Sequence, residues 1–379
     1  MKKIFTLFFC FLAAVFLCYS LNVNTVNAEN MKLTSKSAVL MNCDGEVLFE
    51  HNKDERRPIA SMVKIMTLLL CFENIDANKI SIEDEVVASE RASSMGGSQA
   101  FLDAGASYKV ENLIKSVIIA SANDSCVALA ETISGSVEGF VEQMNKKAED
   151  LGMTNTVFTN CTGLPMAGQF STANDVGIMF SQLIKHKKYF EYANIWMDDF
   201  LHPSGRVTGL TNTNKLIRQY NGCDGGKTGY TAEAGHCLAA TAQRNGTRLI
   251  SVIVGGVDSK TRFSENKALF DYGFANFESK LYLSAEKPIE QKVKVIGGKQ
   301  NELSVKLEKD LTCFGRKGQS AGEIVLELPE KVKAPVTEGD EIGYAHVVVN
   351  GKKVASVKVI AAESVKKATF WDYLKNMVK

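Results

Sequence analysis

Short apolar runs that are separated by turn residues stand at both ends of the first 280 residues. Each pair of runs surrounds a two-residue turn signal: Val39–Met41 and Val47–Phe49 around Asp44-Gly45, and His236–Ala242 and Arg248–Val254 around Asn245-Gly246. Such pairs are typical of β-hairpins. Because strands joined by hairpins run antiparallel, we predict a mainly antiparallel sheet from these segments.

Longer apolar patterns lie between the two hairpins and predict helices. Pro58 to Phe72 begins with a proline, which suits a first helical turn, and is apolar nearly all round. Residues from about 110 to 150 repeat apolar side chains at helical spacing, and Ser264 to Phe277 is predicted as a further helix. Strands at both ends with helices between them predict an α/β fold.

Beyond about residue 285 the composition becomes strand-like, with alternating polar and apolar residues in several short segments. The pattern occurs in Lys292–Val295, Ser304–Leu307 and Val325–Leu328, and Asn350-Gly351 lies between two more apolar runs. Alternation with period two is the signature of half-buried strands. We therefore predict a small all-β domain at residues 285–362, and we recognise no catalytic motif in it.

The N-terminus has the features of a secretory signal. Lys2 and Lys3 precede the apolar stretch Ile4–Tyr19, and Val26-Asn27-Ala28 is typical of a cleavage site. The apolar run is short for a membrane span, so we predict a signal peptide at residues 1–28 and export of the protein. An uncleaved membrane anchor is the alternative.

The C-terminal residues 363–379 are predicted to form an amphipathic helix. Apolar and aromatic residues recur there at helical spacing beside several lysines: Phe370, Trp371, Tyr373, Leu374, Met377 and Val378. A helix of this composition is typical of the membrane interface. The alternative is a terminal helix that packs on its own domain.

Composition excludes several classes of protein. The formal net charge of the 379 residues is +1, which gives no basic face of the kind that binds nucleic acid. Nine cysteines without a C-x-x-C pair indicate neither a zinc site nor a disulfide framework. We predict buried cysteines, with a reactive Cys126 as the alternative, and no metal or cofactor, because the five histidines are dispersed.

Candidate chemistry begins with Ser61-Met62-Val63-Lys64, an S-x-x-K pair. Residues three apart share one face of a helix, which places the Lys64 ammonium near the Ser61 hydroxyl. A serine hydroxyl is a poor nucleophile until a base takes its proton, and a neutral lysine can be that base if burial lowers its pKa. The pair alone proves little, because Ser364 and Lys367 repeat the spacing in the tail.

Two further motifs follow in order along the chain. Ser121-Ala122-Asn123 is an S-x-N sequence, and Lys227-Thr228-Gly229 is a K-T-G sequence that occurs once. The ordered triple S-x-x-K, S-x-N and K-T-G is known from penicillin-binding proteins and class A β-lactamases. The set, rather than any one motif, indicates a serine acyl-transfer enzyme.

The chain resembles the low-molecular-mass penicillin-binding proteins, the serine-type D-alanyl-D-alanine carboxypeptidases of the peptidase S11 type. Besides the triple, several segments resemble the family in sequence: Ser121–Ser125, Val127–Glu131, Leu151–Thr156, Asn160–Leu164, Ser171–Asp175 and Lys227–Gly235. The resemblance covers about residues 33–280. It implies a β-lactamase/transpeptidase-like domain at residues 29–280, with an antiparallel sheet and a helical cluster, before the β domain and the amphipathic helix.

The resemblance also implies catalytic roles. Ser61 attacks the bond between the two terminal D-alanines of a peptidoglycan pentapeptide stem, and an acyl-enzyme forms. Lys64 is the base for this attack. Ser121 relays the proton to the leaving amine, Asn123 holds Lys64 and the substrate amide, and Lys227 supports the electrostatics of the site.

The same resemblance implies a set of binding residues. Thr228, with Lys227, receives the terminal carboxylate, and Arg262 lies nearby. Gly229 belongs to the same motif, and the backbone N–H groups of Ser61 and Tyr230 form the oxyanion hole. β-Lactams are then covalent inhibitors, and the enzyme acts outside the cell, on the outer face of the cytoplasmic membrane that faces the cell wall. Asp175 is predicted to be a structural carboxylate at a helix start.

Three other functions are alternatives to a carboxypeptidase. A class A β-lactamase has S-D-N where this chain has Ser121-Ala122-Asn123, and its E-x-x-L-N run is missing here. A catalytically inactive wall-binding protein does not need the complete set of motif residues. A D,D-endopeptidase of the same fold, which cleaves cross-links instead of free stems, remains the second hypothesis.

Overall fold

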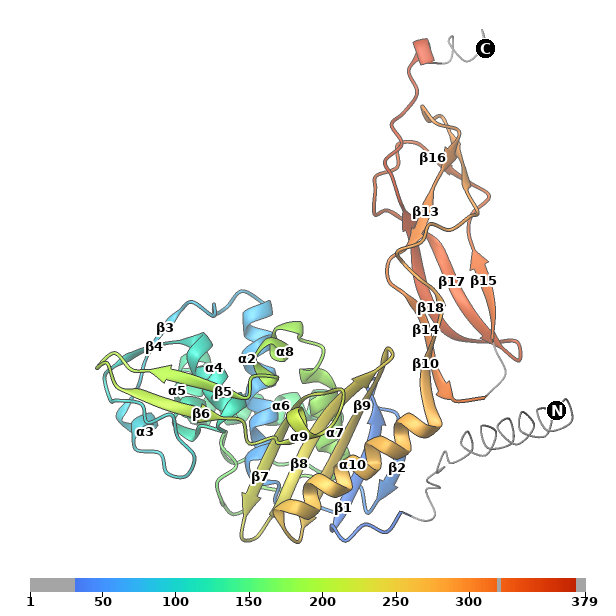
Figure 1. Ribbon diagram of the computed structural model, residues 1–379. Coiled ribbons are helices and arrows are strands. Elements are labelled where there is room, and N and C mark those ends of the chain that lie inside the picture. The colour runs from blue at the N-terminus through green and yellow to red at the C-terminus, as the bar shows by residue number, and fades with distance from the viewer. Residues whose placement is uncertain (1–30, 319–321, 373–379) are drawn as a thin grey trace, which may run out of the picture. The chain divides into compact units, whose positions relative to one another are not determined.

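The computed structural model describes residues 31–318 and 322–372 (Figure 1). The described chain divides into two compact units. The first comprises the described residues up to Arg244 together with Arg248–Ala275, and the second comprises Asn245–Thr247 and the described residues from Asn276 onward. The predicted signal peptide at 1–28 lies outside the described residues.

A five-stranded sheet in the order β2-β1-β9-β8-β7 forms the centre of the first unit. Its strands are β1 (Ser37–Asn42), β2 (Val47–His51), β7 (Cys223–Thr231), β8 (Gly235–Arg244) and β9 (Thr247–Gly256). β1 pairs antiparallel with β2 and β9, and β7 pairs antiparallel with β8. At the two predicted turns, Gly45 and Gly246 have φ of 88° and 77°, which glycine adopts without strain. The predicted antiparallel sheet is confirmed.

Helices cover both faces of this sheet. The helices are α2 (Lys64–Asp76), α3 (Glu90–Ser93), α4 (Val110–Ile119), α5 (Asn123–Ser134), α6 (Val137–Asp150), α7 (Ala173–Leu183), α8 (Lys187–Ala193), α9 (Leu216–Gln219) and α10 (Ser259–Asn276). α10 lies along one face (Figure 1), where Gly273 packs against Leu40 and Leu249. On the other face, Gly177 of α7 packs against Met41 and Val39. All six residues of β1 are therefore buried.

The helix predicted from Pro58 begins later in the structure. Residues Ala60–Val63 form the 3₁₀ turn η2, and α2 starts at Lys64. Ala60 has φ of 48°, which is outside the right-handed helical region, so regular α-helix cannot extend back to Pro58. The prediction of one continuous helix is wrong at this end, and Ser61 lies in the 3₁₀ turn.

Two small two-stranded antiparallel sheets complete the first unit. They consist of β3 (Glu85–Val87) with β4 (Ser107–Lys109), and β5 (Met197–Leu201) with β6 (Val207–Thr211). The helical region predicted at 110–150 consists of α4, α5 and α6, with breaks before Asn123 and Val137. These breaks matter for the site, because Ser121 lies in the first of them.

The second unit is made of strands. They are β10 (Phe277–Leu283), β11 (Val293–Ile296), β12 (Glu302–Leu303), β13 (Val305–Leu307), β14 (Leu311–Arg316), β15 (Glu323–Glu327), β16 (Lys331–Lys333), β17 (Glu341–Val349) and β18 (Lys352–Ala361). The largest sheet has the order β13-β18-β17-β15. Asn350-Gly351 joins β17 to β18, as predicted, and the alternating residues Val305, Leu307, Val357 and Val359 point into one apolar core.

The tail corrects the predicted start of the terminal helix. Residues 363–369 are not helical: Val365 forms an antiparallel bridge with Val336 and is buried, and Lys367 forms one with Gly298. Helical residues begin at Phe370, and Leu374, Met377 and Val378 lie outside the described residues. Within the described chain, we find no helix of the length and apolar character that a membrane crossing requires.

Candidate active site

Ser61 lies where the 3₁₀ turn η2 meets the edge strand β7. Two glycines allow this approach. A Cβ atom on Gly229 would lie 2.7 Å from the Ile59 carbonyl oxygen, and one on Gly163 would overlap the Ala60 carbonyl oxygen. Gly163 also has φ of 79°. Backbone from three distant segments can therefore meet at Ser61 only because two of them carry no side chain.

Lys64 lies behind Ser61 and makes three polar contacts. Its Nζ is 3.0 Å from Ser61 Oγ, 2.6 Å from Asn123 Oδ1 and 2.5 Å from the Thr162 carbonyl oxygen. The side chain is fully buried. Because burial disfavours the charged form, the pKa of Lys64 is lowered from its usual value.

Ser121 and Asn123 occupy the break between α4 and α5. Ser121 has φ of 65°, an unusual conformation for a residue other than glycine, and Asn123 is the first residue of α5. The Asn123 side chain donates from Nδ2 to the Gly96 carbonyl at 2.6 Å, which directs its Oδ1 to Lys64. Strained backbone of this kind persists at functional sites where the surroundings enforce it.

The edge strand β7 supplies Lys227 and Thr228. Lys227 Nζ donates to Ser121 Oγ at 2.8 Å and to the Thr228 carbonyl at 3.0 Å. Burial lowers its pKa well below the usual value, and the neighbouring Lys64 charge lowers it further. Thr228 Oγ1 donates to Thr213 Oγ1 at 2.8 Å. The structure thus brings the predicted S-x-x-K, S-x-N and K-T-G residues into one connected group.

Solvent reaches one member of this group more than the others. Lys64, Ser121, Asn123 and Lys227 are all buried, whereas Ser61 is partly exposed. A partly exposed hydroxyl that is backed by a buried amine can meet a substrate from solvent while its base stays desolvated. This is the arrangement that an activated serine nucleophile requires.

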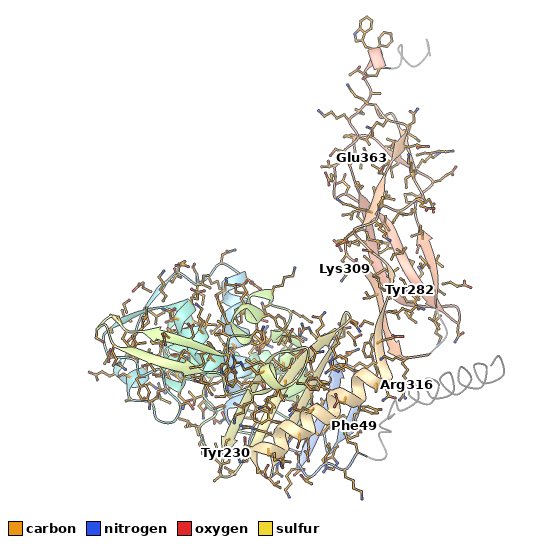
Figure 2. All side chains as sticks on the ribbon, in the orientation of Figure 1. Phe49, Tyr230, Tyr282, Lys309, Arg316 and Glu363 are labelled. Atoms are coloured by element: carbon orange, nitrogen blue, oxygen red, sulfur yellow. The ribbon has the colours of Figure 1, made fainter. Side chains whose placement is uncertain are left out.

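Arg262 and Tyr230 lie beside the K-T-G motif. Arg262, on α10, donates from Nη1 to the Gly229 carbonyl at 3.1 Å, and its buried Nε has no hydrogen-bond partner among the described residues. Tyr230 stacks on His236 and is 60% exposed near the β7–β8 turn (Figure 2). A partly buried guanidinium with an unused N–H group is suited to an anionic ligand.

Sequence reasoning missed several residues that organise the site. They are the Thr162 carbonyl on Lys64, Gly163 under the Ala60 carbonyl, the Gly96 carbonyl on Asn123, and Thr213 on Thr228. The family-like stretch Asn160–Leu164 was a usable signal for Thr162 and Gly163. No comparable signal marked Gly96 or Thr213, whose roles depend on contacts between distant segments.

The sequence also singles out Asp175 and Cys126, and both have the contacts or burial of structural residues. Asp175 accepts hydrogen bonds from the Asn155 backbone at 3.1 Å and the Thr156 hydroxyl at 2.7 Å near the start of α7. Cys126 is buried, and burial raises the pKa of its thiol to about 11. All seven cysteines in the described chain are free thiols. The described residues also contain no group of three His, Cys, Asp or Glu side chains that could hold a metal ion.

Comparison with protein families identifies the chain. Residues 22–258 match the family model described as peptidase S11, D-alanyl-D-alanine carboxypeptidase. This protein belongs to the peptidase S11 family. Residues 277–367 match a second model, described as the C-terminal domain of penicillin-binding protein 5. The predicted family and enzyme class are confirmed.

Curated relatives agree with this assignment over most of their length. The D-alanyl-D-alanine carboxypeptidase DacF of Bacillus subtilis is 40% identical over 90% of this chain and 88% of the relative. DacC of Escherichia coli, also a D-alanyl-D-alanine carboxypeptidase, is 33% identical over 91% of this chain and 89% of the relative. Both relatives therefore match across the two units of the chain.

Solved structures confirm the fold. Penicillin-binding protein 5 from Haemophilus influenzae is 34% identical, with a TM-score of 0.66 over 89% of this chain and 99% of that structure. A variant of the DD-transpeptidase of Streptomyces K15 is 26% identical, with a TM-score of 0.61 over 65% of this chain and all of that structure. The fold is therefore the transpeptidase-like α/β fold, followed by an all-β domain.

Proposed function

We propose that this protein is a penicillin-sensitive D-alanyl-D-alanine carboxypeptidase that removes the terminal D-alanine from peptidoglycan pentapeptide stems through an acyl-enzyme on Ser61. The observation that carries the proposal is the partly exposed Ser61 hydroxyl, 3.0 Å from the buried Lys64 Nζ. The family assignment supports the substrate class. Catalysis is assigned to the predicted domain at residues 29–280.

Lys64 has the contacts that a neutral amine needs to act as a base. A neutral amine has two N–H groups and one lone pair. The two shortest contacts of Nζ are to the acceptors Asn123 Oδ1 and Thr162 O, which take the two N–H groups. The lone pair is then left for the Ser61 hydroxyl proton. Burial, which lowers the pKa of Lys64, increases the neutral fraction near pH 7.

Ser121 is the proposed proton relay. Its Oγ accepts a hydrogen bond from Lys227 Nζ, so its own hydroxyl proton remains available for the leaving amine. In the proposed step, Ser61 Oγ gives its proton to Lys64 and bonds to the carbonyl carbon, and the C–N bond breaks. The proton held by Lys64 then passes through Ser121 to the amine of the leaving D-alanine. Water then attacks the ester and releases the shortened stem from Ser61.

The substrate carboxylate is proposed to bind at the K-T-G motif. Thr228 supplies a hydroxyl, Lys227 supplies donors, and Arg262 lies within reach of the Gly229 carbonyl with an unused Nε–H group. The Ser61 and Tyr230 backbone N–H groups are the proposed oxyanion donors. One such donor contributes about 3–4 kcal/mol to transition-state stabilisation in a serine hydrolase.

The proposed activity is tested by mass analysis of the products from a purified pentapeptide muropeptide, with a cross-linked muropeptide dimer as competitor. We expect loss of one D-alanine from the pentapeptide and little cleavage of the dimer. Preferred cleavage of the dimer would support the D,D-endopeptidase hypothesis. Absence of both reactions would contradict the proposal.

Gly163→Ala is expected to slow acylation by a β-lactam by about 100-fold, since displacement of reacting groups by about 1 Å has an effect of this size. The added methyl group would overlap the Ala60 carbonyl oxygen and push the Ser61 turn out of place. Gly168→Ala is the matched control, because its φ of 81° imposes similar strain with only Thr159 Cγ2 near the new methyl, at 3.9 Å. Equal rates for the two variants, measured by stopped-flow acylation, would contradict the steric argument.

The tail is proposed to associate with the outer face of the cytoplasmic membrane after export. Phe370 and Trp371 are 72% and 71% exposed and begin the segment with the amphipathic pattern. Because Val365 belongs to the β-domain core, the deletion that tests this hypothesis should start at Phe370 and not at Glu363.

Deletion of residues 370–379 is expected to move the protein from the membrane fraction to the soluble fraction. The β-domain contacts of Val365 and Ala368 remain in this variant, so D-alanine release from a soluble pentapeptide should be unchanged. Fractionation followed by immunoblotting measures the first effect. Membrane association that survives the deletion would show that another segment anchors the protein.

A further inference from the structure

A loop at residues 96–103 encloses the Asn123 side of the site. The Gly96 carbonyl accepts from Asn123 Nδ2 at 2.6 Å, and the Ser98 carbonyl accepts from the Asn123 backbone N–H at 2.7 Å. A Cβ atom on Gly97 would lie 2.8 Å from Asn123 Nδ2. The position of Asn123, and hence of the Oδ1 atom that contacts Lys64, therefore depends on the course of this loop.

Asp124, which follows Asn123 in α5, binds the second half of the same loop. The Asp124 carboxylate accepts from the backbone N–H groups of Ala100 at 3.0 Å and Leu102 at 3.1 Å. Phe101, between them, has φ of 65°, which is rare for a bulky side chain, and its ring is exposed. Such a conformation persists only where its surroundings enforce it.

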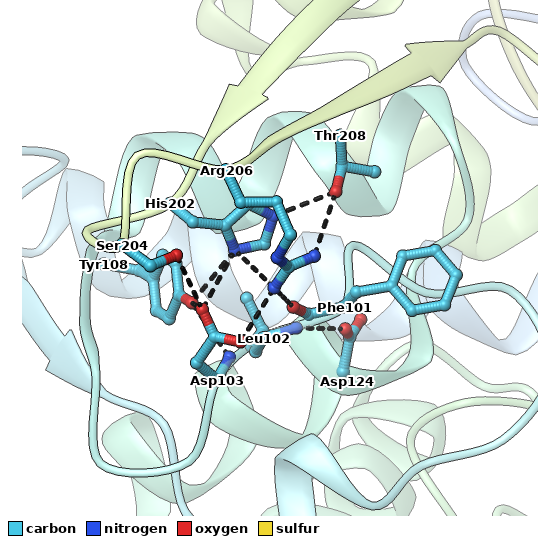
Figure 3. A network of polar contacts seen from close by, with 9 residues as sticks. All are labelled: Phe101, Leu102, Asp103, Tyr108, Asp124, His202, Ser204, Arg206 and Thr208. Atoms are coloured by element: carbon cyan, nitrogen blue, oxygen red, sulfur yellow. Dashed lines mark hydrogen bonds and ion pairs between the residues drawn. The ribbon is translucent and has the colours of Figure 1, made fainter.

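Arg206 contacts this strained residue from outside the loop. It lies in the turn between β5 and β6, and its Nη2 donates to the Phe101 carbonyl at 2.6 Å and to Asp103 Oδ1 at 2.8 Å (Figure 3). The two N–H bonds of one nitrogen thus bind both a loop carbonyl and a loop carboxylate. The Phe101 backbone is held between Asp124 on the inner side and Arg206 on the outer side.

His202 and Tyr108 position the arginine and its partner. His202 Nε2 lies 2.9 Å from Thr208 Oγ1, Nδ1 lies 3.1 Å from Tyr108 Oη, and Tyr108 Oη accepts from the Asp103 N–H at 2.9 Å (Figure 3). Burial lowers the pKa of His202, so the imidazole is neutral at pH 7 and can accept from Tyr108 at Nδ1. His202 Nδ1 also lies 3.1 Å from Arg206 Nη2, and Tyr108 Oη lies 3.4 Å from Asp103 Oδ2, so His202 contacts the arginine and Tyr108 contacts its carboxylate partner.

The hairpin that carries Arg206 also reaches the K-T-G side of the site. β6 ends at Thr211, and two residues later Thr213 Oγ1 accepts from Thr228 Oγ1 at 2.8 Å. The Thr213 backbone N–H donates to the Ile119 carbonyl at 3.1 Å, near the end of α4. One hairpin therefore touches the Asn123 loop at its turn and Thr228 beyond its last strand.

We propose that Arg206 is a positioning residue of the peptidase site, which holds loop 96–103 and through it the Asn123 amide against Lys64. The inference rests on the proposed function, because it assigns Arg206 a role in that reaction. The side chains of Arg206 and Asp103 are 41% and 44% exposed, so their ion pair contributes little to global stability. Its effect is local, on the geometry of the loop, and is expected in catalysis rather than in folding.

Arg206→Ala is expected to lower kcat for D-alanine release at least about tenfold, since misplacement of a catalytic group by about 1 Å can cost about 100-fold. KM should change less than kcat, because the proposed carboxylate residues are not altered. Tm should stay within about 4 °C of the wild-type value, as expected for the loss of an exposed ion pair. Arg206→Lys keeps a cation that can donate to the Phe101 carbonyl and Asp103, and should restore part of kcat.

Arg244→Ala is the matched control. Arg244 Nε also donates to a backbone carbonyl, that of Asn221, at 2.9 Å, but this contact is not in loop 96–103. The kcat of Arg244→Ala should therefore equal the wild-type value. If Arg206→Ala does not fold, Asp103→Asn is measured instead and should lower kcat with little change in Tm. An Arg206→Ala kcat within about twofold of wild type, or a loss shared by Arg244→Ala, would overturn the inference.

Measurements on the wild-type protein distinguish a failure of this inference from a failure of the proposed function. If the wild type releases D-alanine and Arg206→Ala does so equally well, only the role of Arg206 is wrong. If the wild type releases none, the proposed activity is wrong, and the ratio of β-lactam acylation rates for the two proteins then decides the role of Arg206.

Discussion

Replacing Ser61 by alanine is expected to abolish covalent labelling by a fluorescent penicillin and to stop D-alanine release. The acyl-enzyme needs the Ser61 Oγ atom, which is the partly exposed hydroxyl beside Lys64. Loss of a serine nucleophile lowers kcat by about 10⁶-fold in a well-studied serine protease, and we expect an effect of that order here. Gel fluorescence and mass spectrometry of the intact protein measure the adduct.

Ser364→Ala is the matched control for this variant. Ser364 and Lys367 have the same spacing as Ser61 and Lys64, but Ser364 Oγ accepts from the Glu338 backbone N–H in the β domain. This control should label as strongly as the wild type. A penicillin adduct on the Ser61→Ala protein would show that another residue is the nucleophile.

Replacing Lys64 by methionine is expected to slow β-lactam acylation by about 10³- to 10⁴-fold, which is the upper part of the range for general base catalysis. Methionine has a similar length, so it should fill the buried space, but it cannot take the Ser61 proton. Asn123 Oδ1 and the Thr162 carbonyl would lose their donor, at about 1–3 kcal/mol for each unsatisfied buried group. Removal of a buried amine offsets part of this loss.

The pH dependence of acylation tests the same role. Burial lowers the pKa of Lys64, and the deprotonated amine is the active form, so the wild-type rate should rise as pH rises through that lowered pKa. The Lys64→Met variant should lack this acid limb. Lys147→Met, which breaks a pair with Glu73 between α6 and α2, is the control and should keep the wild-type profile. An unchanged acid limb in Lys64→Met would assign it to another group.

The elements that the sequence predicted well are those whose signals are local. Asn245-Gly246 and Asn350-Gly351 each form a two-residue turn between paired strands, with positive φ at both residues, and Gly45 has positive φ in the four-residue connection between β1 and β2. Local signals failed at Pro58, where the helix does not begin, because Ala60 takes a positive φ beneath Gly163. They also failed at residues 363–369, where a bridge between Val365 and Val336 overrides the helical pattern.

For the site, the ordered motifs were sufficient to group Ser61, Lys64, Ser121, Asn123 and Lys227, and the structure places their side chains in contact. Motif spacing does not indicate which other atoms form hydrogen bonds with these five side chains. The Thr162 carbonyl on Lys64 and the Gly96 carbonyl on Asn123 are backbone groups, which carry no sequence signature of their own. The catalytic roles of the five motif residues stay predictions.

The sequence by itself therefore determined the family, the α/β and all-β organisation, and the residues proposed for the chemistry, because these depend on residue type and order along the chain. Only the tertiary structure decided that Lys64 is fully buried while Ser61 remains reachable from solvent. It alone also placed Arg206 on the Phe101 carbonyl, across 105 residues of chain. Burial and long-range hydrogen bonds arise when distant segments pack together, and these features set pKa values and the positions of reacting atoms.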